Sequence, residues 1–204
     1  MFDIPDFQTI AVRVLLTAGS LFLWFLTQKM IGARSIADGA IYDHLHVLTA
    51  RWNGWLNQHP KAANAMLIAS SFCVDAVTLF VLFYAVLGPS FTPFWGLFGL
   101  FALRQLSQAS VALPVPQGIV WRDPGFPSLF VTYGVGNDFF FSGHTALAVY
   151  GAMQLATMHI SALTVVGAVV AVLQVIAVIV LRAHWTTDVL AGLFAALTVG
   201  LIVL

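Results

Sequence analysis

Charge is scarce in this chain. Only 8% of its 204 residues are charged, none of them is glutamate, and the basic and acidic side chains cancel to a formal net charge of zero. An ordinary soluble domain carries about a quarter charged residues, and a nucleic-acid-binding domain usually has a basic surplus. The composition therefore excludes an ordinary soluble domain and gives no support for a nucleic-acid partner.

Cysteine is almost as scarce. The single cysteine, Cys73, lies within an apolar run, so no disulfide framework can form inside the chain. Apolar residues are abundant instead: 60% of the chain is hydrophobic, and the mean hydropathy is +0.95. These values predict an integral membrane protein.

Six apolar segments approach the length of about 20 residues that a helix needs to cross roughly 30 Å of hydrocarbon. Their apolar residues run on without the alternation of a membrane β-barrel. We therefore predict an all-α fold, a polytopic membrane protein with a six-transmembrane-helix bundle and an interfacial amphipathic helix, in a single domain that covers residues 1–204. The predicted spans are 9–28, 63–87, 93–112, 143–158, 161–181 and 187–204.

Two connections between these spans are long. In connection 29–62, Leu45, Trp52 and Trp55 belong to a row of apolar residues at helical spacing. This row predicts the amphipathic helix, with its tryptophans at headgroup depth. Connection 113–142 holds four prolines and four glycines. Its backbone is predicted to be irregular and to lie at the membrane surface or in a protein-lined cavity.

The side of the membrane on which the connections lie follows from counting spans. Six spans place both termini on one side and connections 29–62, 113–142 and 182–186 on the other. Most basic residues lie on the connection side, which the positive-inside rule assigns to the cytoplasm. Basic residues that bind phosphate would bias the same count.

The stretch "RAHWTTD", residues 182–188, is polar and lies between two apolar runs. His184 and Asp188 are four residues apart and share one face of a helix that starts near Trp185. A carboxylate there can accept the imidazole Nδ1–H, fix the tautomer and leave Nε2 free to act as a base or nucleophile. A polar helix start capped by Asp188 explains the same residues without chemistry.

The stretch "NDFFFSGHT" precedes another apolar run. Ser142 is a good helix N-cap, and Gly143 lets a ligand approach the backbone closely. A helix N-terminus offers free N–H groups and a positive dipole end, which suit a phosphate group. His144 would stand beside that phosphate as a proton donor. The alternative is an N-cap followed by an interfacial histidine.

An arginine, Arg104, lies inside the apolar segment 93–112. Arginine within a membrane is costly and usually faces a cavity or a charged partner. Its planar guanidinium suits phosphate oxygens. The alternative is a structural pair with Asp75, which lies in the middle of the second predicted span.

Together these motifs resemble the type 2 phosphatidic acid phosphatase superfamily, since "SGH" is followed 40 residues later by H-x-x-x-D. Finer features are more similar to its sphingomyelin synthase branch: Arg104 ahead of "LPVP", the aspartate four residues before the serine of "NDFFFSGHT", and "AHWTTDV". The similarity covers residues 100–192. The phosphatase branch carries a lysine six residues before an Arg–Pro pair, and an arginine where this chain has Val178. Both are missing here, which favours the synthase branch.

The resemblance implies a reaction at phosphorus. His184 is the implied nucleophile and forms a phospho-histidine, Asp188 orients it, and His144 protonates the leaving alcohol and then deprotonates the incoming one. No cofactor and no metal are implied, and the sequence has neither H-E-x-x-H nor an Asp-rich loop. The candidates for holding phosphate oxygens are Arg104, Arg182, Ser142 and the Gly143 amide.

A cationic headgroup is a further expectation. Asp138 lies beside three consecutive phenylalanines, 139–141. With Tyr133, Phe141 and Trp185, it is expected to hold such a headgroup through charge and aromatic faces, and ordinary interfacial aromatics are the alternative. The remaining histidines are expected to have surface roles; they are His44, His46, His59 and His159.

The expected function is a membrane lipid phosphotransferase, similar to sphingomyelin synthase, that moves a phospho-headgroup between lipids. The close alternative is a lipid phosphate phosphatase or phospholipase C-like hydrolase with the same residues. The alternative of another class is a transporter in which Asp75, Arg104 and Asp188 line an ion path. The expected partners are membrane lipids, with a phospholipid donor and a lipid alcohol or water as acceptor, and a homo-oligomer stays open. Analogy with the family places the active site at the extracytoplasmic surface, against the charge count, and we adopt the analogy.

Overall fold

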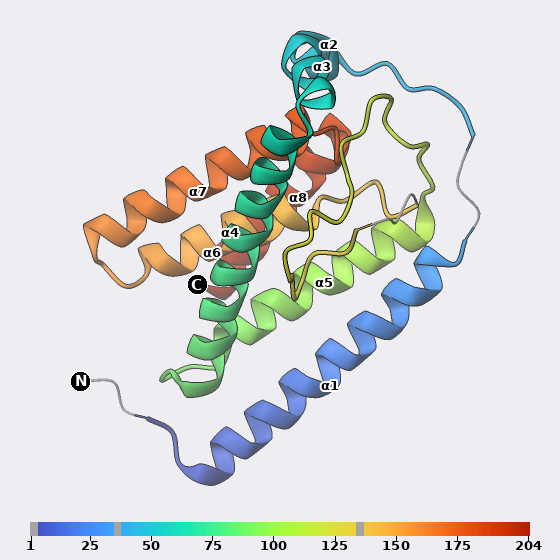
Figure 1. The fold of residues 1–204 in the computed structure, drawn as a ribbon. Helices are drawn as coiled ribbons and strands as arrows, with labels where there is room; N and C mark the ends of the chain where they lie inside the picture. Colours follow the sequence, from blue (N-terminus) through green and yellow to red (C-terminus); the bar gives the residue numbers. More distant parts are fainter. Residues whose placement is uncertain (1–3, 35–37, 134–136) are drawn as a thin grey trace.

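The protein is built from helices (Figure 1). The computed structural model describes residues 4–34, 38–133 and 137–204, and within these parts it contains eight α-helices and no strand. The all-α prediction is confirmed. The helices are α1 (Phe7–Gly32), α2 (His44–Leu48), α3 (Ala50–Gln58), α4 (Pro60–Leu87), α5 (Thr92–Ser110), α6 (Gly143–Ala156), α7 (Ser161–Val180) and α8 (Thr186–Val203).

Six of these helices, α1 and α4 to α8, occupy the six segments predicted as spans. Four of the six, α1, α4, α7 and α8, are long and apolar enough to cross a membrane, which indicates an integral membrane protein. Helix α6 has only 14 residues, and α5 carries Arg104, Gln105 and Gln108 in its second half. The structure therefore supports four spans rather than the predicted six, because α6 is short and the polar residues of α5 lower its mean hydropathy.

Two helices begin where the sequence offers a cap. Asp6 accepts a hydrogen bond from the Thr9 backbone N–H at 2.9 Å at the start of α1. Ser142 accepts one from the Thr145 backbone N–H at 3.3 Å at the start of α6. Side-chain caps of this kind satisfy backbone donors that have no partner inside the helix. The Ser142 cap thereby fixes where α6 begins, and with it the position of His144.

Helix α6 lies at the centre of the bundle and packs against α4, α7 and α8. Small residues allow close contacts: a Cβ on Gly192 of α8 would lie 2.5 Å from the Ser142 carbonyl oxygen, and one on Gly167 of α7 would lie 2.9 Å from the Ala152 Cα. In a bilayer, where lipid tails remove the hydrophobic force between helices, such close packing stabilises the bundle. The Ser142 N–H also donates to the Asp188 carbonyl at 2.9 Å, so α6 and α8 start side by side.

The helix predicted between residues 29 and 62 is present but divided. Thr49 has φ −94° and ψ 5° and separates α2 from α3. Its hydroxyl donates to the Leu45 carbonyl at 2.7 Å, so the prediction of one continuous helix is wrong at this residue. Trp52 and Trp55 face outward, at 61% and 51% exposure, as expected of tryptophans at headgroup depth.

One of the four histidines expected at the surface is buried. His46 is only 5% exposed, because α2 turns its ring toward the segment before α8. The surface role predicted for His46 is therefore wrong. His44, His59 and His159 are exposed, as predicted.

The long connection between α5 and α6 folds against the helices (Figure 1). Its Leu129 and Phe130 backbone N–H groups donate to the Asp75 carboxylate of α4, at 2.9 and 3.0 Å. Irregular backbone at membrane depth needs protein partners of this kind. Asp75 is satisfied in this way, and the Asp75–Arg104 pair considered from the sequence does not form.

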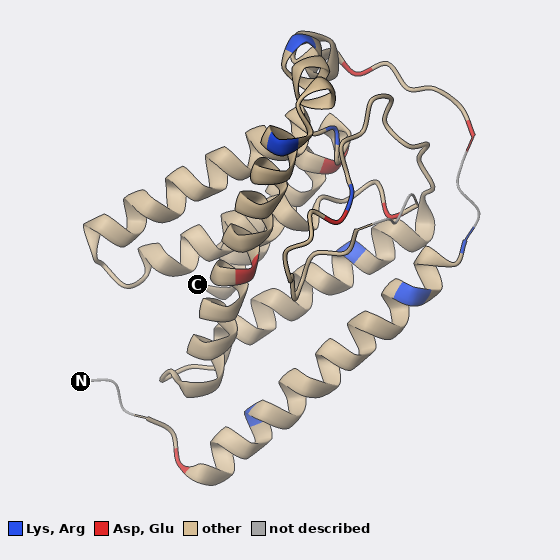
Figure 2. Cartoon of the chain, in the orientation of Figure 1, with Lys and Arg blue, Asp and Glu red and all other residues tan. Residues whose placement is uncertain are grey.

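One end of the bundle gathers the segments of interest. We call it the loop end, and it comprises α2, α3, residues 111–133 and 137–142, and residues 181–185. These segments are joined by hydrogen bonds, among them Trp185 Nε1 to the Pro114 carbonyl and the Val120 N–H to the Leu181 carbonyl, both at 2.8 Å. In Figure 2, the positions of charged residues are more numerous toward this end and few along the apolar helices.

Replacing Gly192 by alanine is expected to destabilise the protein, because the new Cβ would collide with the Ser142 carbonyl. Overpacking of this kind costs about 1–3 kcal/mol. The control is Gly99→Ala on α5, whose Cβ would meet only Val199 at 3.8 Å or more. Both changes gain the same helix propensity, so thermal unfolding in detergent should show a melting temperature several degrees lower for Gly192→Ala alone. Equal melting temperatures for the two variants would contradict the close α6–α8 contact.

Candidate active site

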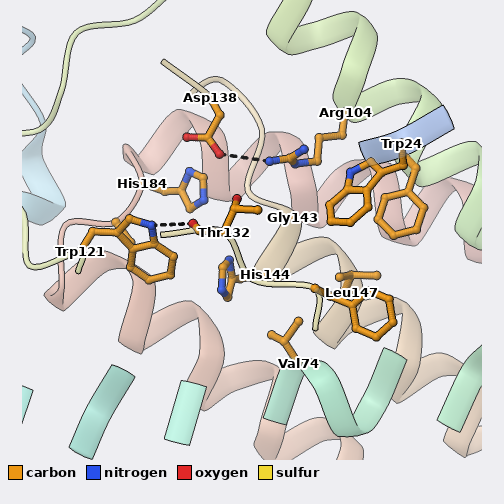
Figure 3. A pocket seen from close by; sticks show the side chains of 13 residues that line it. Trp24, Val74, Arg104, Trp121, Thr132, Asp138, Gly143, His144, Leu147 and His184 are labelled. Carbon is orange, nitrogen blue, oxygen red and sulfur yellow. Dashed lines mark hydrogen bonds and ion pairs between the residues drawn. The ribbon is translucent and has the colours of Figure 1, made fainter. Parts of the chain in front are cut away.

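A small cavity lies at the loop end, between α1, α4, α5 and α6 (Figure 3). Its lining includes five of the residues that the sequence predicted for chemistry: Arg104 of α5, Asp138 of the long connection, Gly143 and His144 of α6, and His184 before α8. These residues come from three distant parts of the chain. The fold thus brings most of the predicted chemistry into one place.

The two histidines face each other across this cavity. The ring centroids of His144 and His184 are 6.2 Å apart, with 56° between the ring planes. Both residues are buried, at 8% and 6% exposure. A separation of this size leaves room for one reacting group that contacts both rings.

His184 is oriented by Asp188. Its Nδ1 lies 3.2 Å from Asp188 Oδ2, and the same oxygen accepts the Trp185 backbone N–H at 3.2 Å. Asp188 has no exposed surface, so water screens its charge little and a charged imidazole beside it is stabilised. With Nδ1 engaged, Nε2 is the nitrogen left for a substrate.

His144 has a buried nitrogen without a partner. Within the described parts of the chain its Nε2 makes no hydrogen bond, although the ring is enclosed and Trp121 meets it edge-on at 5.1 Å between centroids. Buried polar atoms nearly always have partners, and an exception calls for a functional explanation.

Arg104 is held by an ion pair and an amide (Figure 3). Its Nη2 lies 3.2 Å from Asp138 Oδ2, and its Nη1 donates to Gln28 Oε1 at 2.6 Å. A Cβ on Gly143 would lie 3.2 Å from Arg104 Nε, so glycine at this position makes room for the guanidinium. The buried pair is neutral as a whole, and either charge alone would be much more costly to bury.

Two of the phosphate-binding candidates are directed elsewhere. The Ser142 hydroxyl accepts hydrogen bonds from the Thr145 backbone and side chain. Ser142 thus acts as the N-cap of α6, the role that the sequence offered as an alternative to phosphate binding. Arg182 donates to the carbonyl of Gln117 and, at 3.1 Å, to that of His46. Its guanidinium therefore braces the loop end. Neither side chain lines the cavity.

The aromatic headgroup candidates are not brought together. Tyr133 and Phe141 pack into the hydrophobic core, and Trp185 donates from Nε1 to the Pro114 carbonyl. Only Asp138 of the predicted headgroup set lines the cavity. The other three are drawn inward because the long connection packs on the helices instead of forming an open rim.

Helix α2 holds the His184 segment in place, which the sequence reasoning missed. His46 Nε2 donates to the His184 carbonyl at 3.0 Å, and its ring stacks on Trp185 at 5.2 Å between centroids. Asp43 accepts hydrogen bonds from the Thr186 backbone and hydroxyl, both at 2.7 Å. Its position just before an apolar helix was a visible N-cap signal, but no sequence pattern marks its partner 143 residues away.

The electrostatics of α2 suit this role. Burial raises the pKa of the Asp43 carboxyl, but the hydrogen bonds from Thr186 and the His46 backbone outweigh it, and the pKa of Asp43 lies below its usual value. Burial also lowers the pKa of the His46 imidazole, an effect that nearby Asp43 opposes only in part. At neutral pH, Asp43 is therefore a carboxylate, and His46 is a neutral ring that donates to the His184 carbonyl.

Other neighbours of the cavity carry no motif. Trp24 of α1 and Trp121 of the long connection line it, and Gln28 of α1 binds the Arg104 guanidinium. No local pattern distinguishes these residues from the other aromatic and amide residues of the chain. In the part of the chain that the structure describes, no group of three or more His, Cys, Asp or Glu lies close enough to hold a metal ion.

The sequence that forms this site is similar to sequences of known proteins. The sequence profile of the family described as AtPDCT1/2 matches residues 42–203, well over half of the chain. The chain belongs to the AtPDCT1/2 family. It is also similar to phosphatidylcholine:diacylglycerol cholinephosphotransferase 1 of Arabidopsis thaliana, with 27% identity over 189 residues. The aligned region is 91% of this chain and 60% of that protein, so the chain spans about three fifths of the length of this curated relative. No solved structure matches the chain.

The stretch matched by the AtPDCT1/2 family contains most of the cavity. It begins one residue before Asp43 and ends in α8, and therefore includes Arg104 and both histidines that face each other. Helix α1, with Trp24 and Gln28, lies ahead of it. The match thus covers the chemistry-bearing residues and leaves one wall of the cavity outside.

Replacing Asp43 by alanine is expected to lower the stability of the loop end. The change removes the cap of α2, worth about 1 kcal/mol, and leaves the Thr186 donors without their acceptor, which costs about 1–3 kcal/mol more. The control is Asp38→Ala, the same change at an exposed residue five positions earlier. Thermal unfolding, together with hydrogen exchange of the 181–186 backbone, measures the effect. Equal exchange in the two variants would show that α2 does not hold this segment.

Proposed function

We propose that this member of the AtPDCT1/2 family transfers a phosphocholine-type headgroup from a glycerophospholipid to diacylglycerol through a phospho-histidine on His184. The observation that carries the proposal is the pair of imidazoles 6.2 Å apart in a cavity that also holds Arg104. The Arabidopsis relative is named for transfer between phosphatidylcholine and diacylglycerol. The motif resemblance to the sphingomyelin synthase branch supports the same class of reaction.

The first step breaks the bond between the headgroup and its donor lipid. Nε2 of His184 attacks phosphorus, a P–N bond forms, and the P–O bond to the glycerol backbone breaks. His144 enters this step as the imidazolium, with a proton taken up when the anionic phosphate binds, and gives that proton to the leaving alkoxide, so diacylglycerol leaves as a neutral alcohol. Asp188 stabilises the positive charge that develops on the His184 ring.

The second step reverses these roles. His144 removes the proton from the hydroxyl of the incoming diacylglycerol, whose oxygen attacks phosphorus. The P–N bond breaks, His184 returns to its neutral form, and a new phospholipid leaves. Atoms and charge balance over the two steps, and neither a metal nor another cofactor is required.

Charge in the cavity matches a zwitterionic headgroup. The phosphate diester carries a negative charge that Arg104 and the amide of Gly143 can stabilise. The quaternary ammonium group carries a positive charge that Asp138 can stabilise. Arg104 and Asp138 neutralise each other at 3.2 Å. A bound zwitterion would replace this one ion pair by two, between Arg104 and the phosphate and between Asp138 and the ammonium group.

The surroundings of the cavity favour transfer over hydrolysis. Val74, Phe101 and Leu147 form part of its lining together with Trp24, and these apolar walls exclude bulk water from the phospho-histidine. An acceptor that arrives from the lipid phase is therefore favoured over bulk water. From the resemblance of the motifs to the type 2 phosphatidic acid phosphatase superfamily, we place the cavity at the extracytoplasmic surface.

The direct test incubates purified protein with vesicles of phosphatidylcholine labelled in its headgroup and diacylglycerol with acyl chains of a different mass. Transfer yields labelled phosphatidylcholine with the new acyl chains, which lipid mass spectrometry identifies. Hydrolysis would release water-soluble phosphocholine instead. Release of phosphocholine without a new phospholipid would overturn the transferase assignment in favour of the hydrolase.

Replacing either histidine of the cavity is expected to stop transfer. His184→Ala removes the nucleophile, and His144→Ala removes the proton shuttle, which contributes about 10²–10⁴-fold. The matched control is His159→Ala, at the exposed turn between α6 and α7, which should transfer at the normal rate. Phosphorus-labelled donor should leave base-stable label on the unsubstituted protein and none on His184→Ala. Transfer that survives in His184→Ala would rule out the phospho-histidine.

Replacing Asp138 by asparagine is expected to weaken selection of the cationic headgroup. The variant keeps the size and the polar oxygen but loses the charge that faces the ammonium group, an effect on the order of tenfold in kcat/KM for choline and ethanolamine lipids. Competition between phosphatidylcholine and phosphatidylglycerol, whose headgroup has no cation, measures the change. Unaltered preference for choline lipids would exclude Asp138 from headgroup binding.

A further inference from the structure

Helix α1 is the least enclosed of the four candidate spans. Only 11% of its apolar window is buried, against 28–39% for α4, α7 and α8. It is fastened near both ends: Arg13 donates to the Gly88 carbonyl at 2.7 Å, and Asn137 donates to the Gly32 carbonyl at 3.0 Å. Between these two points α1 packs against α5, and a groove runs along the contact between the two helices.

We call this hollow the α1–α5 groove. It has a volume of about 290 Å³ and continues, past Thr27 and Gln105, into a wider hollow of about 510 Å³ toward the C-terminal end of α1. Its lining is largely apolar. The lining includes Ser20, Leu23 and Thr27 of α1 and Phe98, Ala102 and Gln105 of α5.

The groove and the catalytic cavity share a wall. Trp24 and Phe101 line both, and their ring centroids are 5.4 Å apart. Figure 3 shows Trp24 at the side of the cavity, beside Arg104. The cavity itself has a volume of only about 30 Å³, room for one or two water molecules. A phosphorylated headgroup can therefore enter only if a wall moves, and this wall borders the open groove.

In the first of these hollows, two buried polar atoms have no partner among the described residues: Trp24 Nε1 and Gln105 Oε1. Trp24 is only 5% exposed, so bulk water reaches its indole poorly. An unpaired buried donor or acceptor is unfavourable, and a glycerolipid offers a partner for each. An ester carbonyl can accept from the indole N–H, and the free hydroxyl of diacylglycerol can donate to the amide oxygen.

The length of the groove suits an acyl chain. From Ser20 to Ile31, the α1 side of the two connected hollows advances about 16 Å along the helix axis. The hydrocarbon of one leaflet is about 15 Å deep. The groove therefore matches the depth that the acyl chains of one leaflet occupy.

We infer that the α1–α5 groove binds the acyl chains of the lipid substrate and that Trp24 and Phe101 form the gate through which its headgroup enters the cavity from the side. The lipid backbone lies at Trp24, its chains lie in the groove, and its phosphate reaches Arg104. The inference rests on the proposed function, because it takes the cavity to be the place where a lipid headgroup reacts. It adds α1, which lies outside the stretch matched by the family, to the substrate site.

The first experiment maps bound lipid without turnover. Full-length His184→Ala protein in nanodiscs is incubated with a phosphatidylcholine that carries a photoreactive diazirine on its acyl chain, and labelled peptides are identified by mass spectrometry. Label concentrated in residues 20–31 and 98–109 is the expected result. Label spread evenly over the lipid-facing surfaces of α4, α7 and α8 would overturn the inference.

The second experiment fills the groove. Ala102→Trp places an indole in it, whereas the control, Ala76→Trp, places the same side chain in a separate apolar hollow between α1 and α4 that shares no residue with the cavity. Ala102→Trp should lower photolabelling and raise KM for long-chain phosphatidylcholine by about tenfold, with a much smaller effect on dihexanoyl phosphatidylcholine. Ala102→Leu, a milder filler, should give the same pattern at reduced size if the tryptophan variant folds poorly. Trp24→Phe, which keeps a ring and loses the N–H, should raise KM about fivefold.

The outcomes separate this inference from the proposed function. If the unsubstituted protein transfers no headgroup but label still concentrates in the groove and falls in Ala102→Trp, the proposed function fails and the lipid site stands. If transfer occurs but Ala102→Trp and Ala76→Trp behave alike toward long-chain lipid, the groove is not the route and the proposed function stands.

Discussion

The cavity depends on one backbone contact, between the N-terminus of α6 and the first turns of α8. The Ser142 N–H donates to the Asp188 carbonyl at 2.9 Å, and the glycine at position 192 lets the two backbones come this close. His144 and His184 lie at the starts of these two helices. The contact therefore brings two rings that are 40 residues apart in the sequence to a centroid distance of 6.2 Å. Because a bilayer supplies no hydrophobic force between helices, this fit and its hydrogen bond hold the imidazoles together.

Polar side chains attach the other elements to this centre. Asn53 of α3 donates to the Val180 carbonyl at 3.0 Å, and Gln174 of α7 donates to Ser70 of α4 at 2.6 Å. The Asp75 carboxylate binds two N–H groups of the long connection. In a chain with so few polar residues, a shift in packing would leave such groups buried and unpaired. Scarcity of polar groups thus specifies how the helices meet.

The sequence was sufficient to predict a structural feature wherever that feature depends on residues close together in the chain. Apolar runs located the long helices, the Ser142 cap located the start of α6, and the four-residue spacing of His184 and Asp188 predicted their contact. It failed where partners lie far along the chain: Arg104 pairs with Asp138, 34 residues on, and His46 is buried by a bond to a carbonyl 138 residues on. The span count failed for a different reason, since α6 is too short and α5 too polar to qualify as spans.

The charge of the cavity limits which reactions it can favour. Arg104 is matched by Asp138, and the other nearby arginine, Arg182, is engaged by backbone carbonyls of Gln117 and His46. A zwitterionic diester adds no net charge to this site, whereas a phosphate monoester would bring up to two negative charges, and both arginines described near the cavity already have partners. Burying an unmatched charge is strongly unfavourable. This charge balance among the described residues supports the proposed exchange of a zwitterionic headgroup over hydrolysis of a phosphate monoester.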